Sequence, residues 1–312
     1  MIKKPSEIIN TDNKFRVLIA GYPGIGKTTL GLSAPKPLLI DVDFGINRVM
    51  ASARKDFIQP ESYDELLNDL TGDLSDYETI VIDTGGKLLD LMKAYVIRQD
   101  IKNAKKDGSL SLQGYGAVGR EFTRFMNHIY YDLRKHCVII FHAVEEKQDE
   151  DTKLRILVEG STKNTVWQNI ELGGFIEMRG DKKTIGFSNC ERYFAKSSFG
   201  IKGLYNIPEL NENTPNEFLT RLFEQANKNI QDESKIFEQE KKEYQEVMNK
   251  YIPIIERMTT ETVEEVLEKL KSAEHKLTSK KELSARFLEK IKELNLKFNK
   301  ETGKYEIERK EM

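Results

Sequence analysis

The sequence predicts an α/β core with a mostly parallel central sheet, followed by a small helical domain. Three observations carry this prediction. Short apolar runs alternate with helical stretches over the first two thirds of the chain, a glycine-rich motif follows the first run, and Lys and Glu dominate from residue 227 onward. A chain of 312 residues is long enough for two domains. We therefore predict a core domain at residues 1–226 and a charged helical extension at residues 227–312.

Four almost wholly apolar runs predict the strands of the core. They lie at residues 15–20, 37–41, 79–83 and 137–141. Short runs without polar alternation are typical of strands that are covered on both faces of a parallel sheet. Helical stretches lie between them, at residues 62–70, 86–99 and 117–135. This alternation predicts repeated β-α-β units.

Antiparallel strands are expected after these units. The candidates are residues 154–159, 175–179, 183–189 and 191–196. Gly180 and Asp181 lie between the second and the third candidate, and such a pair is typical of a turn.

The C-terminal segment predicts three helices and a hairpin, at residues 232–251, 260–273, 280–294 and 296–307. Pro253 is expected to end or kink the first helix. Ser279 and Glu282 are spaced as a capping box that opens the third. The second helix has one apolar face, formed by Val263, Val266, Leu267 and Leu270.

The strongest motif follows the first strand. It reads Gly21-Tyr22-Pro23-Gly24-Ile25-Gly26-Lys27-Thr28-Thr29 and matches the phosphate-binding P-loop pattern G-x-x-x-x-G-K-[ST]. Backbone N–H groups of such a loop converge on phosphate oxygens, Lys27 is expected to reach the β- and γ-phosphates, and Thr28 to ligate Mg²⁺. The alternative is a glycine-rich turn that matches by chance, but the preceding strand and following helix favour the P-loop. Residues 21–29 thus predict binding of ATP with Mg²⁺.

Two further carboxylate positions end predicted strands, where parallel sheets place their ligands. Asp83 closes the run at 79–83 and is the natural Walker B residue, with Mg²⁺ as its expected partner. Its alternative role is to cap the helix that follows. Asp43 follows the run at 37–41 and is a candidate base for the attacking water, with Asp41 as its rival. Simple loop aspartates remain the alternative for this pair.

Charge and composition exclude several classes of protein. A net charge of −2 with a pI of about 6.2 excludes a uniformly basic nucleic-acid binder, although a local basic patch stays possible. Cys137 and Cys190 are too few and too far apart for a disulfide scaffold or a four-thiolate zinc site. No apolar stretch predicts a secretory signal or a membrane helix. We expect a protein of a reducing compartment without a membrane partner.

In this order, the motifs resemble the RecA/RadA-like ATPase core over roughly residues 15–200. The resemblance implies a RecA-like P-loop NTPase core, with a catalytic base at the end of the second strand. Here Ile40-Asp41-Val42-Asp43 has Asp where that family has Glu, which implies slow hydrolysis. Asp83-Thr84 matches the end of the Walker B strand, and His142 takes the place of a polar sensor of the γ-phosphate. A histidine that caps a strand end is the other interpretation of His142.

More narrowly, the chain is similar to compact RecA-like proteins of bacteriophages, including RecA-like single-strand annealing recombinases. The stretches that carry this likeness are Gly-Tyr-Pro-Gly-Ile-Gly-Lys-Thr-Thr, Ile-Asp-Val-Asp-Phe-Gly, and His142 followed by Glu145-Glu146-Lys147. The resemblance implies a DNA-dependent ATPase in the cytoplasm of a bacterial host that assembles into rings or filaments. It also implies a cation that a neighbouring subunit supplies to the γ-phosphate, with Lys196 as first candidate and Arg192 as second.

The same resemblance implies that two segments bind single-stranded DNA. The first, residues 101–116, contains Lys102, Lys105, Lys106 and Tyr115. The second, residues 146–164, contains Lys153, Arg155 and Lys163 among acidic residues. Lysines follow phosphates and aromatic rings stack on bases, but solvated loops are an equal alternative for each segment. The single tryptophan, Trp167, is expected to serve packing rather than base stacking.

Three functions remain open at this stage. The first is an ATP-dependent recombination protein that binds single-stranded DNA and promotes annealing or strand exchange. The second is a P-loop switch that binds a protein partner through its C-terminal helices and has no role on DNA. The third, a small-molecule kinase or a motor ATPase, is less favoured because no lid-like cluster of arginines is seen in the sequence.

Overall fold

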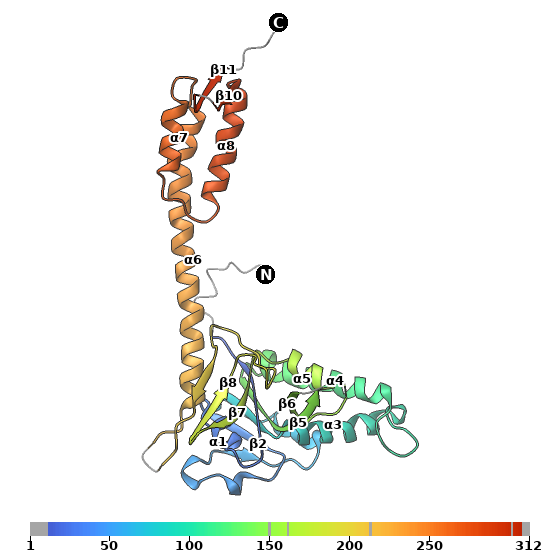
Figure 1. Cartoon of the computed structure of the whole chain (residues 1–312). Helices are drawn as coiled ribbons and strands as arrows, with labels where there is room; N and C mark the ends of the chain where they lie inside the picture. The colour runs from blue at the N-terminus through green and yellow to red at the C-terminus, as the bar shows by residue number, and fades with distance from the viewer. Residues whose placement is uncertain (1–11, 149–150, 161, 212–213, 301, 308–312) are drawn as a thin grey trace. The chain divides into compact units, whose positions relative to one another are not determined.

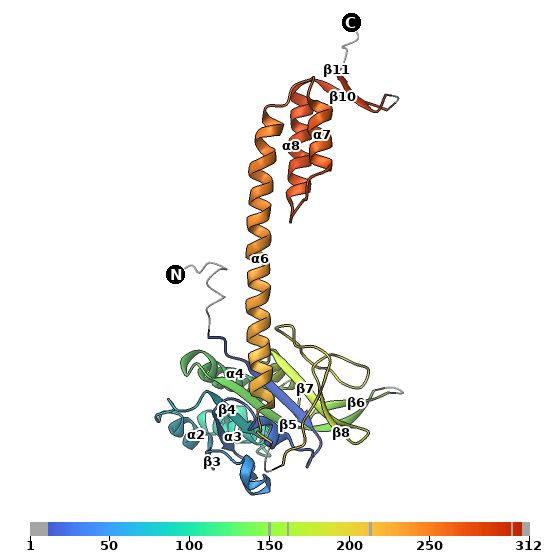
Figure 2. The same cartoon turned by 90° about the vertical axis from the view of Figure 1, so that its left-hand side faces the viewer.

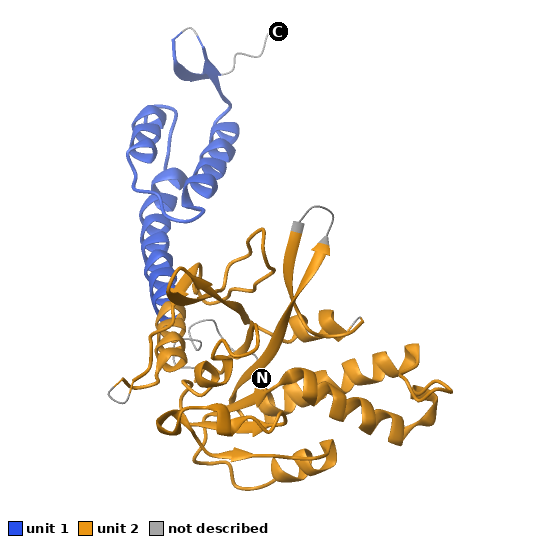
Figure 3. Cartoon of the chain, turned by 60° about the horizontal axis from the view of Figure 1, so that its bottom comes forward, with its two compact units in different colours: residues 1–11, 231–312 blue, residues 12–230 orange. Residues whose placement is uncertain are grey.

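The computed structural model describes residues 12–148, 151–160, 162–211, 214–300 and 302–307. These residues form two compact units, shown in different colours in Figure 3. The first unit is Asp12–Ile230, and the second contains the chain from Gln231 onward. The dividing point lies inside one long helix, α6 (Phe218–Glu256).

A nine-stranded sheet organises the described part of the first unit, in the order β3-β2-β4-β5-β1-β7-β8-β9 (Figures 1 and 2). All pairings from β3 to β7 are parallel, β8 and β9 are antiparallel, and β6 pairs with the outer half of β5. The predicted fold class is confirmed. The strands are β1 (Arg16–Gly21), β2 (Pro37–Asp41), β3 (Phe57–Ile58), β4 (Thr79–Asp83), β5 (His136–Gln148), β6 (Asp151–Ile156), β7 (Leu172–Arg179), β8 (Lys182–Gly186) and β9 (Leu204–Asn206).

Helices cover both faces of this sheet, which explains why the central strands are apolar without alternation. Leu18 and Ala20 of β1 belong to one core cluster, and Val17 and Ile19 to the other. The first cluster contains α2 (Tyr63–Asp69), α3 (Gly85–Gln99), α4 (Leu112–Asn127) and α5 (Thr162–Gln168). The second contains α1 (Lys27–Gly31) and the first two turns of α6.

Three expectations about helices and loops of the first unit need correction. Helix α4 begins at Leu112, not at residue 117, because Ser111 caps it by accepting a hydrogen bond from the Gly114 N–H. Part of the segment 101–116 is therefore helical. The segment 146–164 is not one loop, since it contains the end of β5, all of β6 and the first residues of α5.

The strand expected at residues 191–196 does not form. Tyr193 and Ala195 are buried in the alternating pattern of a strand, which explains the expectation. However, Tyr193 bridges to Leu154 of β6, whereas Lys196 bridges to Gly173 of β7. Two different partner strands prevent a continuous ladder.

The second unit has a core of its own. It is formed by the end of α6, α7 (Val263–Lys271), α8 (Ser279–Glu293) and the hairpin of β10 (Leu296–Asn299) and β11 (Lys304–Ile307). The predicted hairpin and the apolar face of α7 are confirmed, with Val263, Val266 and Leu270 buried. No helix among the described residues has the length and apolar character to cross a membrane.

Helix α6 differs from its prediction at both ends. It begins at Phe218, fourteen positions before residue 232, because Leu219, Leu222 and Phe223 bury their side chains in the first unit's core. It also continues through Pro253 to Glu256. The proline lies three residues before the end of the helix. Its missing N–H therefore affects only the last turn, where several backbone groups have no helical partner in any case.

The capping box predicted for α8 is wrong. Ser279 is buried, and its hydroxyl accepts a hydrogen bond from the Lys276 N–H at 3.0 Å. The carboxylate of Glu282 instead accepts from the hydroxyls of Thr278, at 2.5 Å, and Tyr244, at 2.7 Å. Glu282 thus binds Thr278 and the distant Tyr244 instead of the backbone of Ser279.

Candidate nucleotide site

The loop between β1 and α1 contains backbone conformations with positive φ, and glycines occupy these positions. Gly24 has φ 77° and Gly26 has φ 97°, a region that residues with a Cβ rarely adopt. Gly21 is required for space instead, since a Cβ there would lie 3.0 Å from Ile25 Cγ2 and 3.2 Å from the Ile176 oxygen. The three motif glycines therefore serve a tight turn and close packing of this turn on β7.

Lys27 folds back into the loop that precedes it. Its side chain is buried, and its Nζ donates to the Tyr22 carbonyl at 2.9 Å. The Nζ also lies 3.3 Å from Nδ1 of His142, which β5 places opposite Gly21 in the sheet register. Burial lowers the pKa of Lys27, while the charges of Asp83 and Asp43 oppose this shift. Burial and the Lys27 charge lower the pKa of His142, which favours a neutral ring that accepts from Lys27.

Thr28 of α1 and Asp83 at the end of β4 are hydrogen-bonded to each other. The Thr28 hydroxyl donates to Oδ2 of Asp83 at 2.5 Å. Burial raises the pKa of Asp83, with the Thr28 hydrogen bond and Lys27 acting against it. In P-loop sites, Mg²⁺ is held by a hydroxyl, a carboxylate and substrate phosphates rather than by a cage of protein ligands. The pair fits this donor set, and no cluster of three or more His, Cys, Asp or Glu side chains that could hold a metal occurs in the described ranges.

The two aspartates after β2 have different surroundings. Asp41 is buried, and its carboxylate accepts from the N–H groups of Gly45 and Ile46 and from Gln59, at 2.8 to 3.0 Å. It holds the turn that follows the strand. Asp43 is partly exposed, and Arg48 donates to its Oδ2 at 2.5 Å. Asp43 is therefore the carboxylate of this pair that is open to a ligand.

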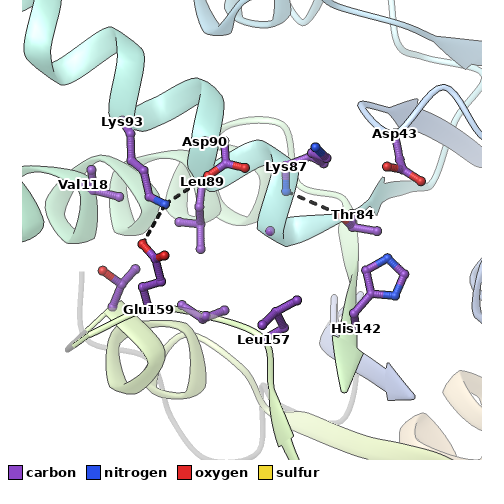
Figure 4. A pocket seen from close by; sticks show the side chains of 13 residues that line it. Asp43, Thr84, Lys87, Leu89, Asp90, Lys93, Val118, His142, Leu157 and Glu159 are labelled. Atoms are coloured by element: carbon purple, nitrogen blue, oxygen red, sulfur yellow. Dashed lines mark hydrogen bonds and ion pairs between the residues drawn. The ribbon is translucent and has the colours of Figure 1, made fainter. Parts of the chain in front are cut away.

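A pocket of about 320 Å³ begins at Asp43, Thr84 and His142 (Figure 4). Its far end is lined by Lys93, whose Nζ binds Asp90 at 3.0 Å and Glu159 at 3.2 Å. Helix α3 follows Asp83 directly and supplies one wall. The structure thus brings together four predicted residues, Lys27, Asp43, Asp83 and His142, beside one cavity.

A second pocket, of about 340 Å³, borders the P-loop itself. Ile25, Gly26 and Thr29 line it, together with residues 207–210 and 215–218. Asn216 fixes this wall to α1, because its Nδ2 donates to the Thr29 carbonyl at 2.8 Å. Lys183 also lines this pocket, although no motif in the sequence predicts it there.

The two candidate cations of the segment 191–196 have other partners among the described residues. Lys196 Nζ donates to the Trp167 carbonyl at 3.3 Å. Arg192 pairs with Glu177 at 2.7 Å and approaches Glu145 to 4.0 Å. Glu145 also accepts from the hydroxyl of Tyr22 at 2.6 Å. A role of either cation at a neighbouring subunit's nucleotide stays a prediction.

The two predicted DNA segments differ in how their charges are used. Lys102, Lys105 and Lys106 are exposed, and no ion pair involves them within the described residues. Their segment is anchored by buried Asn103, whose Nδ2 donates to the Val96 carbonyl at 2.8 Å. In the other segment, Glu146 attracts both Arg155, at 3.4 Å, and Lys163, at 3.8 Å.

Trp167 packs as expected. Its ring is stacked on Phe175 with 6.4 Å between centroids, and Phe194 meets it edge-on at 4.9 Å. A Cβ on Gly173 would lie 2.3 Å from the indole, so the glycine makes room for it.

Two solved structures and one family model are similar to parts of this chain. Among solved structures, the chain is similar to one described as an "ATPase Domain", with 12% identity and a TM-score of 0.38 over 62% of this chain and 80% of that one. It is also similar to the flagellar accessory protein FlaH from Methanocaldococcus jannaschii, with 11% identity and a TM-score of 0.30 over 65% of this chain and 95% of that one. No curated protein sequence matches. A family model described as "AAA domain" matches residues 13–199, which contain the P-loop, Asp43, Asp83 and His142. The chain therefore belongs to this AAA-domain family and carries a P-loop ATPase domain.

Proposed function

We propose that this protein is a RecA-like DNA recombination protein of the phage type, which binds ATP and single-stranded DNA and promotes annealing or strand exchange. ATP acts mainly as a switch for assembly, with slow hydrolysis. The observation that carries the DNA role is the exposed lysine segment at residues 101–116. It joins α4 to α3, the helix that starts directly after Asp83.

The nucleotide site supports the first half of the proposal. Lys27 binds the β- and γ-phosphates after leaving the Tyr22 carbonyl, and Thr28 and Asp83 hold Mg²⁺. Asp43 orients the attacking water, and His142 contacts the γ-phosphate. The nucleoside occupies the pocket that begins at Gly26 and Thr29. The short side chain of Asp43, already paired with Arg48, makes hydrolysis slow.

Self-association is the third part of the proposal, after ATP binding and DNA binding. Lys27 lies beside His142, Arg48 is paired with Asp43, and Lys87 lines the same pocket. Phosphoryl transfer is accelerated by a further cation at the γ-phosphate. A neighbouring subunit supplies it through Lys196 or Arg192. Such a head-to-tail contact builds rings or filaments.

Binding of a fluorescent single-stranded oligonucleotide tests the DNA role. We expect binding that strengthens with ATP·Mg²⁺ and weakens as salt increases, because phosphate contacts release counterions. Replacing Lys102, Lys105 and Lys106 by Ala should weaken it about 10- to 100-fold at low salt. A variant with Lys280, Lys281 and Lys292 replaced by Ala has the same net charge, and it should bind like the wild type.

Two outcomes would contradict the proposal. Absence of oligonucleotide binding at low salt, with and without ATP·Mg²⁺, excludes the DNA role. Loss of binding in the control variant alone moves the DNA site to the second unit. Lys27→Ala serves as the nucleotide reference, since it should abolish ATP binding and leave only the nucleotide-independent part of DNA binding.

A second function is favoured by the surface of the second unit. Several of its large apolar side chains are exposed, namely Leu277, Leu288, Phe298 and Ile307. They suit a P-loop switch that binds a protein partner through its C-terminal helices. A partner retained by residues 227–312 alone and resistant to nuclease would support this function. Retention that nuclease abolishes would support the DNA role instead.

A further inference from the structure

Lys183 of β8 is a cation beside the P-loop that no motif assigns to the site. Its Nζ lies 3.7 Å from the position that a Cβ on Gly26 would take. The side chain is exposed, and none of the hydrogen bonds or ion pairs among the described residues involves its ammonium group. An uncompensated positive charge thus adjoins the loop that cradles phosphate.

The backbone of Lys183 is fixed on both sides. It pairs with Met178 of β7 in the antiparallel register, and its carbonyl accepts from the Ile207 N–H at 2.9 Å. Strand β7 in turn pairs with β1, which leads into the P-loop. Only the flexible side chain is therefore free to adjust to a ligand.

The nucleotide site has room for a further cation beside Lys27. A nucleotide brings several negative charges, whereas the buried Lys27 has a lowered pKa and Arg48 is paired with Asp43. The backbone ahead of the P-loop lysine cradles the α- and β-phosphates, and the lysine itself reaches the β- and γ-phosphates. Gly26 therefore lies on the α/β side of the phosphate chain, where the pocket that Lys183 lines also begins.

We propose that Lys183 binds the α- and β-phosphates of the nucleotide from the same chain, opposite Lys27. This inference rests on the proposed nucleotide site and adds a second lysine to it. It follows that the ammonium group contributes equally to binding of nucleoside di- and triphosphates and does not distinguish between them.

Calorimetric titration of the full chain with ATP·Mg²⁺ and ADP·Mg²⁺ tests the assignment. Lys183→Ala should weaken both nucleotides about tenfold at low salt, as expected of one partly exposed charged contact, and by less at high salt. Lys183→Arg keeps the charge and should recover part of the affinity. Lys182→Ala is the matched control, because neighbouring side chains of a strand point to opposite faces. It should bind both nucleotides like the wild type.

The outcomes separate this inference from the function on which it rests. If the wild type binds neither nucleotide, the nucleotide site itself is wrong. If the wild type binds and Lys183→Ala binds equally well, Lys183 has no role. Weakening of ATP but not of ADP would place the ammonium group at the γ-phosphate and overturn the assignment. An equal loss in Lys182→Ala would show a general effect of surface charge.

Discussion

Asp41 and Asp43 stand two residues apart after β2, yet they have different tasks in the structure. The buried carboxylate of Asp41 accepts three hydrogen bonds and holds the following turn. Asp43 lines the pocket beside His142, and among the described residues its carboxylate pairs with Arg48. The geometry therefore favours Asp43 as the group that orients water, in agreement with its position after a strand in the sequence.

This assignment predicts opposite effects of two substitutions at residue 43. Asp43→Glu extends the carboxylate toward the nucleotide and should raise the rate of phosphate release severalfold. Asp43→Asn removes the base and should lower it about 100-fold, within the range of general-base contributions. Steady-state phosphate release measures both, and ATP affinity serves as the control because neither variant changes the P-loop. A lower rate in Asp43→Glu would argue against the role of Asp43 as base.

His136 predicts a pH dependence of stability that is separate from catalysis. Its ring is buried between Phe15 and Phe223, and its Nδ1 accepts from the Phe15 N–H at 3.1 Å. Burial lowers the pKa of His136 from 6.5 to about 4. Between these values the unfolded chain binds a proton that the folded chain does not, so stability falls as the pH falls from 6.5 to 4.

The expected loss from this histidine is about 2 to 3 kcal/mol at pH 4.5 relative to pH 7.5. Urea unfolding at both pH values measures it as the difference between the wild type and His136→Asn, since carboxylates contribute to both proteins alike. His128→Asn changes a partly exposed histidine of the same unit, paired with Asp132, and serves as the comparison variant. Equal pH dependence in wild type and His136→Asn would contradict the prediction.

At the residue scale, local spacing was sufficient for the P-loop and for the carboxylates at strand ends. Lys27, Thr28 and Asp83 could be named because the motif and the strand end are both written in consecutive residues. Lys183 could not be named, because its approach to Gly26 depends on the pairing of β8 with β7 and of β7 with β1. Alternation along β8 tells only that Lys182 and Lys183 face opposite sides.

At the scale of elements, the junction between β4 and α3 decides the geometry of the site. Helix α3 begins at Gly85, directly after Asp83 and Thr84. A Cβ on Gly85 would lie 2.4 Å from the Phe141 ring, which is fully buried and has no space to move. The helix can approach β5 this closely only with glycine at its first position.

Gly85→Ala should therefore destabilise the first unit by about 1 to 3 kcal/mol, the usual cost of overpacking a core. Gly86→Ala is a close control, because a Cβ there would have no neighbour nearer than 3.9 Å. That variant should be neutral or more stable by about 0.5 to 1 kcal/mol, as expected for alanine in place of glycine in a helix. Thermal unfolding of both variants tests the pair, and equal stability of the two would refute the close-approach argument.

Central strands were the elements that the sequence predicted best, since burial on both faces leaves short apolar runs bounded by turn residues. Elements whose ends depend on tertiary contacts were predicted less well. Residues 191–196 alternate like a strand but meet two different partners, and α6 extends to Phe218 because Leu219 and Phe223 find a core. In each case the deciding contact comes from a distant part of the chain.

At the scale of the whole molecule, each of the two compact units has its own hydrophobic core. The described core of the second unit contains Leu283, Phe287 and Ile291 of α8 packed with side chains of α6 and α7. The first unit's clusters contain none of these residues. Most residues from 231 to 242 of α6 are exposed, so this stretch of helix adds little burial of its own. We therefore expect the two units to unfold in separate transitions.

Two matched core substitutions test this expectation. Leu283→Ala and Leu18→Ala both remove a fully buried leucine, the former from the second unit and the latter from β1 of the first. Each should cost about 2 to 5 kcal/mol and lower only the melting transition of its own unit. Differential scanning calorimetry, with ATP·Mg²⁺ added in a second scan, measures both. Because the proposed nucleotide site lies in the first unit, the nucleotide should raise only the transition that Leu18→Ala lowers. A single transition that both substitutions lower equally would show instead that the continuous helix α6 couples the two units into one cooperative system.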